Sequence, residues 1–473
     1  MEENLGQFGD LDIQKLVDKF EKMVSEDENY FFDVDDFEAI IEYFFEKNDL
    51  KNVRVVIDIA IGQHPNVHLF QLKRAQYFLA ANSTKKALNL LSELESLYPA
   101  NSEIHITKGN IFSQLKEFKK SIDSYTKALH YGVEDPEEIF TNIAFEYVNL
   151  GDYENAISFL KKVIDISPAN VAILYEISFC FEMNNRSKDS LDYFTKYIDH
   201  HPYSKTAWFN IGIAYNNLDL YEKAIEAYDF AIAIDETFSS AYFNKANAYA
   251  NLLLYQKAID TYRETFLYED HDAMTHYYIG ECYEKLNDYP LAIDSFKKAL
   301  KIDNELIDAW FAIGLAYDEL EESQKALPYF RKAIKLEPSN ADYWYLYGDS
   351  YYALDQIEEA MNAYRKVSEL NPHNPDIWLD YSNTLSELNK VDQAIEVLEK
   401  GINFQPANSD FYYRLMAYKY DKGFTKEAYE IFTDALKMDY SKHPQLFKYL
   451  PSLENDPAII ELLEIYKNSI LKK

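Results

Sequence analysis

The stretch KTAWFNIGIAYNNLDLYEKAIEAYDFAIAIDETF, from Lys205 to Phe238, carries the pattern on which the whole fold depends. Its apolar residues recur three and four positions apart, first from Trp208 to Tyr215 and again from Ala224 to Ala231. This spacing puts them on one face of a helix, so the stretch predicts two amphipathic helices. Asp219 lies between the two, where a residue that tolerates the left-handed conformation is expected to end the first helix.

The same pattern recurs along the chain with a period of 34 residues. Trp310, Trp344 and Trp378 lie 34 residues apart, and Trp208 lies three such periods before Trp310. Rows of 34 residues, counted from Val34 with a single extra residue near Pro136, therefore share one phase. The twelve rows begin at residues 34, 68, 102, 137, 171, 205, 239, 273, 307, 341, 375 and 409. A residue's place in its row is called its row position below.

Several row positions keep one type of residue. Row position 20 is alanine in nine rows, and row position 15 is Asn, Asp or Gly in nine. Row position 8 is small in ten rows, at Ala75, Gly109, Ala144, Ser178, Gly212, Ala246, Gly280, Gly314, Gly348 and Ser382. Row position 11 is aromatic in ten rows, and row position 32 is proline in seven. Small residues let two helices approach closely, aromatic rings fill the space around them, and proline stops the second helix.

This pattern resembles the tetratricopeptide repeat, and the resemblance covers residues 34–442. It implies an all-α fold, a right-handed superhelical α-solenoid of stacked antiparallel helix pairs, in which the first helices line an extended concave surface. We expect an acidic N-terminal segment with a capping helix at 1–33, about twelve repeats at 34–442, and C-terminal capping helices at 443–473. The end segments either cover the ends of the array or dock onto a partner. Ile41, Met416 and Lys419 depart from the pattern, so the end rows are expected to stack less regularly.

Composition argues against several classes of function. A net charge of −33 disfavours binding to nucleic acid or to an anionic membrane. This charge either keeps a long array soluble or attracts a basic partner. No apolar run is long enough to span a membrane, and the N-terminus lacks the features of a signal peptide, so we expect a cytoplasmic protein. Cys180 and Cys282 share one row position and are expected to be small buried residues without a disulfide.

Motifs that carry chemistry are missing from the sequence. It contains no nucleotide-binding glycine loop, no His-Glu-x-x-His helix and no Cys-x-x-Cys pair. His105 and His276 fall at row position 4, a bulky column, and are expected to be packed rings. The flanks of the array are too short for a catalytic domain. We therefore expect no enzymatic activity, no cofactor and no metal.

The resemblance implies that a partner binds row positions 2, 5, 6, 9, 12 and 13 of the first helices. Asparagine occupies both row positions 6 and 13 in three rows, and an amide can donate to and accept from a peptide backbone. Aromatic residues dominate row position 5, where they either stack on a ligand or pack between repeats. The predicted partner-binding residues are Asn142, Asn149, Tyr175, Phe209, Asn210, Asn217, Phe243, Asn244, Asn247, Asn251, Tyr277, Phe311 and Tyr345.

The asparagines of this set are either ligand-binding or merely solvated, and in both cases their side chains should be accessible. We expect Asn142, Asn210, Asn217, Asn244 and Asn251 to be exposed.

Acidic residues gather in the same columns. Row position 2 is acidic in seven rows, and further acids in the C-terminal half are Glu281, Asp318, Glu319, Asp349 and Asp380. We therefore expect a protein or peptide partner that carries basic or mixed charge. Chaperone-binding members of the resembled family bind a terminal carboxylate through Lys at row positions 2 and 5. No row here has Lys at either position, so the resemblance does not imply recognition of a terminal carboxylate. These features predict a non-catalytic scaffold, and the alternative is a regulatory or substrate-recruiting subunit of an enzyme complex. Oligomeric state and pathway stay open.

Overall fold

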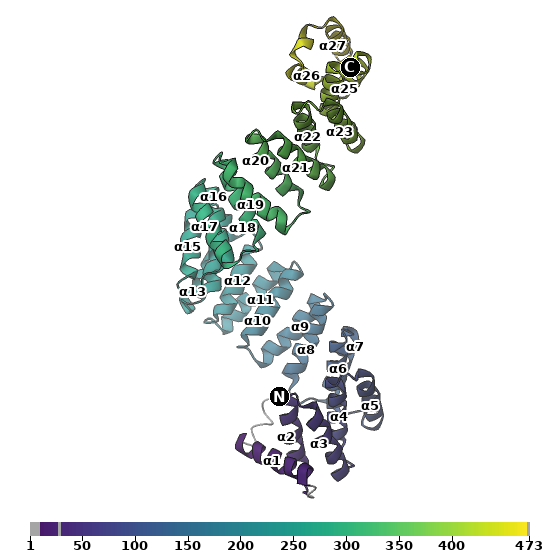
Figure 1. Cartoon of the computed structure of the whole chain (residues 1–473). Helices are drawn as coiled ribbons and strands as arrows, with labels where there is room; N and C mark the ends of the chain where they lie inside the picture. The colour runs from purple at the N-terminus through teal and green to yellow at the C-terminus, as the bar shows by residue number, and fades with distance from the viewer. Residues whose placement is uncertain (1–9, 27–29, 471–473) are drawn as a thin grey trace. The chain divides into compact units, whose positions relative to one another are not determined.

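The computed structural model describes residues 10–26 and 30–470 of the 473. The chain divides into two compact units, Met1–Glu236 and Thr237–Lys473, which we call unit 1 and unit 2. Every regular element in the described residues is a helix, and none is a strand, as the sequence predicts. Figure 1 shows that successive helices within each unit lie side by side in chain order.

Unit 1 contains a first helix and then six helix pairs within its described residues. The first helix is α1 (Asp10–Glu26). The pairs are α2 (Val34–Glu46) with α3 (Leu50–Gln63), α4 (His68–Ala80) with α5 (Thr84–Leu97), α6 (Ser102–Gln114) with α7 (Phe118–Tyr131), α8 (Pro136–Asn149) with α9 (Tyr153–Ile166), α10 (Val171–Met183) with α11 (Ser187–His200), and α12 (Lys205–Asn216) with α13 (Tyr221–Ile234).

Unit 2 contains six more helix pairs and a short helical end in the residues described. The pairs are α14 (Ser239–Asn251) with α15 (Tyr255–Thr265), α16 (Ala273–Lys285) with α17 (Tyr289–Ile302), α18 (Ile307–Glu319) with α19 (Ser323–Leu336), α20 (Ala341–Ala353) with α21 (Ile357–Leu370), α22 (Pro375–Glu387) with α23 (Val391–Phe404), and α24 (Ser409–Asp421) with α25 (Thr425–Met438). The end comprises η2 (Tyr440–Lys442), α26 (Pro444–Tyr449), η3 (Pro451–Asn455) and α27 (Pro457–Ile470).

The helix starts follow the 34-residue period. In eleven of the twelve rows the first helix begins at the residue that opens the row. The exception is α8, which begins one residue early at Pro136, where Asp135 caps the helix through the backbone N–H of Glu137. Proline suits the first position of a helix because that position needs no backbone donor. The predicted repeat is therefore confirmed in both units, including its single irregularity.

Each turn between the helices of a pair contains one residue in the left-handed conformation. This residue is at row position 15 in all twelve pairs, with φ between 53° and 88°. Nine of the twelve are Asn, Asp or Gly, the types that adopt this conformation most readily. Lys116, Leu253 and Glu321 adopt it as well, so the turn geometry is imposed by the pair even where the residue type disfavours it.

The two helices of a pair meet where a small residue faces a large one. Every glycine at row position 8 has an aromatic ring from row position 24 directly over it. A Cβ atom built on Gly280 would lie 2.5 Å from Cε1 of Phe296, and one on Gly348 would lie 2.7 Å from Cε1 of Tyr364. Such distances are well below van der Waals contact, so the ring occupies the space that a side chain would need.

The rings at row position 4 join consecutive pairs. The indole N–H groups of Trp208, Trp344 and Trp378 donate to the carbonyls of Pro202, Pro338 and Pro372 at 2.9–3.0 Å. Each of these carbonyls belongs to row position 32 of the preceding row. Trp378 is buried and the other two are half-buried, so each indole N–H gains a partner that connects it to the turn between repeats.

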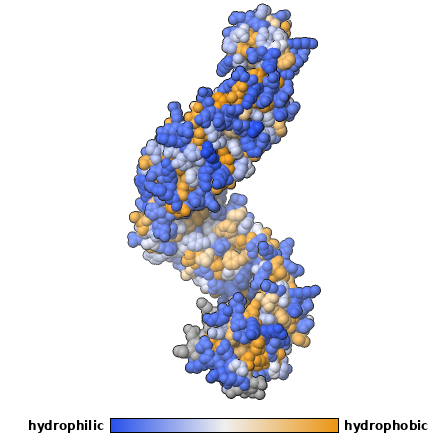
Figure 2. Space-filling model, in the orientation of Figure 1, coloured by the Kyte–Doolittle hydropathy of each residue, from blue (hydrophilic) through white to orange (hydrophobic). Residues whose placement is uncertain are grey.

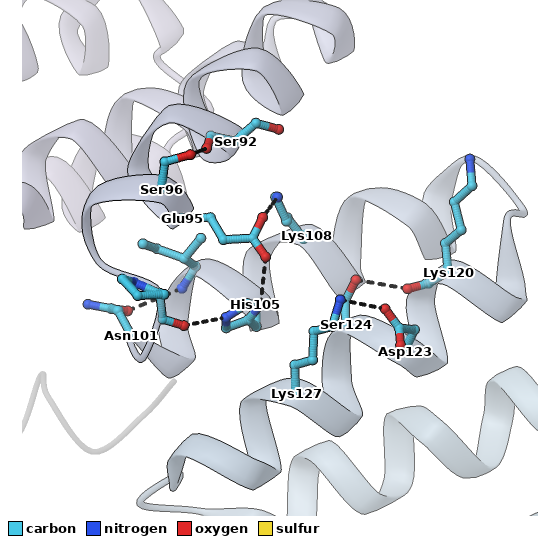
Figure 3. Close-up of polar contacts among 12 residues, drawn as sticks. Ser92, Glu95, Ser96, Asn101, His105, Lys108, Lys120, Asp123, Ser124 and Lys127 are labelled. Atoms are coloured by element: carbon cyan, nitrogen blue, oxygen red, sulfur yellow. Dashed lines mark hydrogen bonds and ion pairs between the residues drawn. The ribbon is translucent and has the colours of Figure 1, made fainter.

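His105 occupies the same column and is a packed ring, as predicted. It is 2% exposed, its Nε2 lies 2.9 Å from the carbonyl oxygen of Pro99, and its ring stacks on Tyr131. Figure 3 shows Glu95 of α5 between His105 and Lys108 of α6. The hydrogen bond from Lys108 lowers the pKa of Glu95. The contacts of Glu95 with His105 and Lys108 connect two consecutive helix pairs. His276 is also buried, as predicted, and packs against Phe266.

Both cysteines are buried and free, as predicted. Cys180 lies on α10 and Cys282 on α16, each within the core of its own unit. Burial raises the pKa of both thiols to about 12, so they stay protonated at neutral pH and are poor nucleophiles.

The ends of the array are also packed. Val17 and Phe20 of α1 join the core that α2 and α3 form. At the other end, the hydroxyls of Tyr420 and Tyr429 donate to the carboxylate of Asp456 at 3.2–3.3 Å. Ile41 and Met416, which replace the small residue of row position 8, are fully buried. The proposed division of the chain into caps and array remains a prediction.

We expect Gly280→Leu to destabilise the protein, because the new side chain must displace the buried ring of Phe296. Overpacking of this kind costs about 1–3 kcal/mol. Gly62→Leu is the matched control, since a Cβ at Gly62 meets no atom within 4 Å. Urea denaturation followed by circular dichroism should show a lower midpoint for the first variant only. Equal midpoints for both would contradict the close contact.

We expect Leu253→Asn to stabilise the protein. Leu253 has a φ of 61° and is 69% exposed, so the change relieves backbone strain and removes little packing. The gain should be about 1 kcal/mol. Asn389→Leu is the reverse change at an equivalent exposed turn with a φ of 57°, and it should shift the denaturation midpoint downward. Shifts of the same sign in both variants would argue against the turn as their cause.

Candidate partner-binding faces

We define the inner face of a unit as row positions 2, 5, 6, 9, 12 and 13 of its first helices. In unit 1 these helices are α2, α4, α6, α8, α10 and α12, and in unit 2 they are α14, α16, α18, α20, α22 and α24. Some first helices of consecutive pairs contact each other directly, as α4 does with α6, α10 with α12 and α22 with α24. The inner face of each unit is therefore a surface to which several helices contribute.

The asparagines of unit 1 do not form the uniform exposed set that we predicted. Asn149 and Asn217 are exposed, and Asn142 is half-buried. Asn210 is 0% exposed, so the expectation that its side chain is accessible was wrong. Its Nδ2 donates to the carbonyl oxygen of Leu174 at 3.0 Å, which joins α12 to α10. The physical reason is that row position 6 of α12 lies against the neighbouring first helix, not against solvent.

Two of the three predicted asparagines of unit 2 form hydrogen bonds within the fold. The half-buried Asn244 donates from Nδ2 to the carbonyl oxygen of Ser240 at 2.9 Å, one turn earlier on its own helix. Oδ1 of Asn247 accepts a hydrogen bond from the hydroxyl of Tyr262. Asn251 is exposed. The asparagines that stay free for a partner are thus concentrated at row position 13, and their role in binding remains a prediction.

The aromatic residues of row position 5 pack on the rings of row position 24. Centroid distances are 5.5–5.8 Å for five pairs, namely Phe209–Tyr228, Phe243–Tyr262, Tyr277–Phe296, Phe311–Phe330 and Tyr345–Tyr364. Tyr175 also contacts Phe209 of the next repeat at 6.1 Å. Phe209 is buried, so it offers no surface to a partner, whereas the other five predicted aromatics are half-buried. Packing therefore accounts for much of this column, and ligand stacking by its exposed edges remains a prediction.

Tyrosine hydroxyls hold carboxylates on the inner face of unit 2. Tyr345 donates to Asp380 at 2.6 Å, and Tyr364 donates to Asp349 at 2.6 Å. Tyr277 likewise donates to Glu281 at 3.1 Å. The sequence analysis found the acids and the tyrosines but not their pairing. The signal was available only for Tyr277 and Glu281, which lie four residues apart on one helix.

Asp318, Asp349 and Asp380 are half-buried carboxylates on the first helices α18, α20 and α22, and we call them the acidic triad. The pKa of Asp349 is raised to about 6, chiefly by burial and also by the negative charges of Asp380 and Asp318, while the hydrogen bond from Tyr364 opposes this rise. Burial also raises the pKa of Asp318 and of Asp380. No described Lys or Arg forms an ion pair with the acidic triad.

Two basic residues of the inner faces, Lys73 and Arg414, are engaged within the fold, whereas Lys285 at row position 13 of α16 is exposed. Lys73 is 8% exposed and pairs with Glu42 and, at 3.2 Å, with Glu38. Arg414 donates to the carbonyl oxygen of Leu379 at 2.6 Å and to the hydroxyl of Tyr449 at 3.0 Å. Neither residue is placed to receive a terminal carboxylate.

Three large apolar side chains of unit 1 were not singled out by the sequence analysis. Phe145 on α8 and Phe179 on α10 occupy row position 9, and Met183 on α10 occupies row position 13. They are 39%, 42% and 49% exposed and belong to no core cluster. The available signal was that row position 9 is aromatic only in these two rows. Figure 2 shows apolar surface among the hydrophilic surface of unit 1.

The described residues contain neither a metal-binding cluster nor a membrane-spanning helix. Nowhere do three or more His, Cys, Asp or Glu side chains gather in a way that would hold a metal ion. No described helix is both long and apolar enough to cross a membrane.

Family models match segments of both units. Models of the tetratricopeptide repeat match residues 102–130, 137–170, 206–238 and 273–305. The model of the cytochrome c-type biogenesis protein H TPR domain matches residues 315–445. No curated protein matches this sequence.

The chain is similar to several solved structures. YrrB, described as a TPR protein with an unusual peptide-binding site, is 23% identical, with a TM-score of 0.35 over 38% of this chain and 93% of its own. The C-terminal part of a TPR repeat-containing protein from Cytophaga hutchinsonii is 20% identical, with a TM-score of 0.44 over 54% and 99%. The Cut9–Hcn1 heterotetramer of the APC/C gives 13% identity and a TM-score of 0.36 over 84% and 93%.

The twelve phased helix pairs, the small-residue and aromatic columns within them, and the family models that match both units agree. The chain belongs to the tetratricopeptide-repeat proteins.

Proposed function

We propose that this protein is a non-catalytic scaffold that binds a protein or extended peptide along its inner faces, and that the segment bound by unit 2 is basic. Tetratricopeptide repeats are protein-interaction modules, which supports the first part. The observation that carries the second part is the acidic triad, three half-buried carboxylates on consecutive first helices that form no ion pair with a described Lys or Arg.

Several acids on the second helices of unit 2 form ion pairs within their own helix. On the second helices, Lys298 pairs with Asp294 at 2.6 Å, Lys366 with Glu369 at 2.8 Å, and Lys437 with Asp434 at 2.8 Å. The acidic triad has no such partner, and Arg414 is the one cation that lowers the pKa of any of its members, Asp380. Half-buried charges of one sign repel one another, and a ligand cation would remove that cost.

The chemistry of the acidic triad suits an arginine or lysine side chain. The hydroxyls of Tyr345 and Tyr364 orient the carboxylates of Asp380 and Asp349 and use only part of their accepting capacity. The remaining oxygen lone pairs can accept charge-assisted hydrogen bonds from a guanidinium or ammonium group. The half-buried rings beside them add apolar and cation–π contact for the stem and head of such a side chain.

The cysteines and histidines support the non-catalytic role and the cytoplasmic location that we propose. Its buried, protonated thiols are unsuited to nucleophilic catalysis, and its histidines at row position 4 are packing residues. Free cysteines fit a reducing compartment, and we place the protein in the cytoplasm. Within this proposal the protein either bridges partners or recruits a substrate or subunit to an enzyme.

A labelled twelve-residue peptide of Arg, Gly and Ser should bind the full chain, as measured by fluorescence anisotropy. Asp318→Asn, Asp349→Asn and Asp380→Asn combined should weaken binding about tenfold or more, because charge-assisted hydrogen bonds are lost. Affinity for the wild type should also fall as salt rises from 50 to 500 mM, a range over which screening becomes severe.

The matched control removes three charges from the second helices of unit 2 through Glu264→Gln, Glu396→Gln and Glu430→Gln, all exposed residues. This variant should bind the peptide nearly as well as the wild type. Equal losses of peptide affinity in both variants would show that only the net charge of the protein matters. Binding that does not depend on salt would contradict the electrostatic proposal.

Asp349→Asn should stabilise the protein at pH 7 and leave it unchanged near pH 4. Because burial raises the pKa of Asp349 to about 6, the folded state favours its protonated form, and its ionisation lowers stability as pH rises from about 4 to 6. Asparagine removes that charge. We expect a gain of about 1 kcal/mol at pH 7 after solvent screening, measured by urea denaturation at both pH values. A loss of stability at pH 7 would contradict the assigned cause.

A further inference from the structure

We infer that the inner face of unit 1 binds apolar anchor side chains of a basic partner segment through Phe145, Phe179 and Met183, which we call the apolar strip. This inference rests on the proposed function, because it assumes that the inner faces bind, and it adds the kind of residue that unit 1 recognises.

The apolar strip lies on two neighbouring first helices. Phe179 and Met183 are four residues apart on α10 and therefore lie one turn apart on one side of that helix. Phe145 has the same row position on α8, and Nδ2 of Asn170 at the start of α10 donates to Glu137 at the start of α8 at 3.3 Å. This hydrogen bond makes α8 and α10 neighbours along the inner face, so an extended peptide segment can contact both helices.

Packing of the fold does not explain the strip. The core positions beside it, Ile143, Ile177 and Cys180, are fully buried, so the interior is closed without these three residues. Phe179 makes one ring contact, with Tyr153 of the preceding pair at 6.3 Å, and remains 42% exposed. Adjacent large apolar side chains in water are characteristic of interaction surfaces.

The surroundings of the strip indicate the chemistry of the occupant. Glu176 and Glu182 lie on the inner face of α10, and the inner-face positions of α8, α10 and α12 include no Lys or Arg. The exposed amides of Asn149 and Asn217 can pair with a peptide backbone. A ligand with apolar anchors and flanking Arg or Lys residues complements this surface. The flexible Met183 side chain can adapt to Leu, Ile, Met or Phe as the anchor.

Charge argues against a second copy of this chain as the occupant. Each copy carries a net charge of −33, and two such surfaces repel each other unless cations intervene. The strip itself is bordered by carboxylates, and a second copy would bring more of them. A basic partner gains from the same charges.

The test compares two labelled peptides on the full chain. One is the Arg, Gly and Ser peptide described above, and the other has two of its Ser residues replaced by Leu and Phe. Wild type should bind the anchored peptide at least tenfold more tightly. Phe145→Ser, Phe179→Ser and Met183→Ser combined should abolish that preference and leave affinity for the plain peptide unchanged.

The control variant is Leu97→Ser, Ile166→Ser and Tyr203→Ser combined. It removes three exposed apolar side chains of unit 1 that lie outside the inner face, with exposures of 71%, 47% and 85%. It should keep the wild-type preference for the anchored peptide. Circular dichroism of both variants checks that they fold.

Three outcomes would overturn the inference. The strip variant could retain the preference for the anchored peptide. Wild type could bind both peptides equally, in which case the proposed function stands and only the apolar strip fails. Sedimentation could show a dimer of the wild type that the strip variant loses, which would make a second copy the occupant. Failure of wild type to bind either peptide would instead count against the proposed function itself.

Discussion

The contact between row positions 8 and 24 is the constraint on which the rest of the structure depends. Where glycine occupies row position 8, an aromatic ring lies directly over it, as Phe296 does over Gly280 and Tyr364 over Gly348. This contact sets how closely the helices of a pair approach, and the fixed turn at row position 15 sets their connection. The inner-face positions 2, 5, 6, 9, 12 and 13 do not take part in this contact and face neighbouring first helices or solvent. Residue types at these positions can therefore change without altering how the two helices of a pair pack.

The sequence predicted the features that depend on this periodic contact. Helix starts, left-handed turns, buried cysteines and the packed His105 and His276 all follow from one residue type recurring at one row position. The side-chain environments of the inner face were harder to predict, as Asn210 shows. Its column is half-buried at Asn142 and Asn244 but fully buried at Asn210, because burial there depends on how closely two particular first helices lie. A repeat pattern predicts which row position a residue occupies, but it does not predict how close the neighbouring first helix lies.

The pairing of tyrosines with carboxylates was hidden for a related reason. Tyr345 and Asp380 lie in different rows, 35 residues apart, and only the stacking of α20 on α22 brings them together. A single row contains no sign of this contact. The sequence analysis therefore identified the acidic character of unit 2 but could not identify which acids are half-buried. The apolar strip was missed because large residues in a helical repeat are usually assigned to the core, and only the structure shows these three outside it.

Each inner face carries a feature that destabilises a protein surface, and the feature differs between the two units. Unit 2 keeps half-buried carboxylates without a cation, and unit 1 keeps large apolar side chains in water. Either arrangement lowers the stability of the free protein, and natural proteins tolerate such departures mainly where they serve function. One class of ligand would relieve both costs, because a segment with apolar and basic residues buries the first surface and neutralises the second. The chemistry of the two units is thus better explained together, by a single kind of partner, than by two unrelated ones.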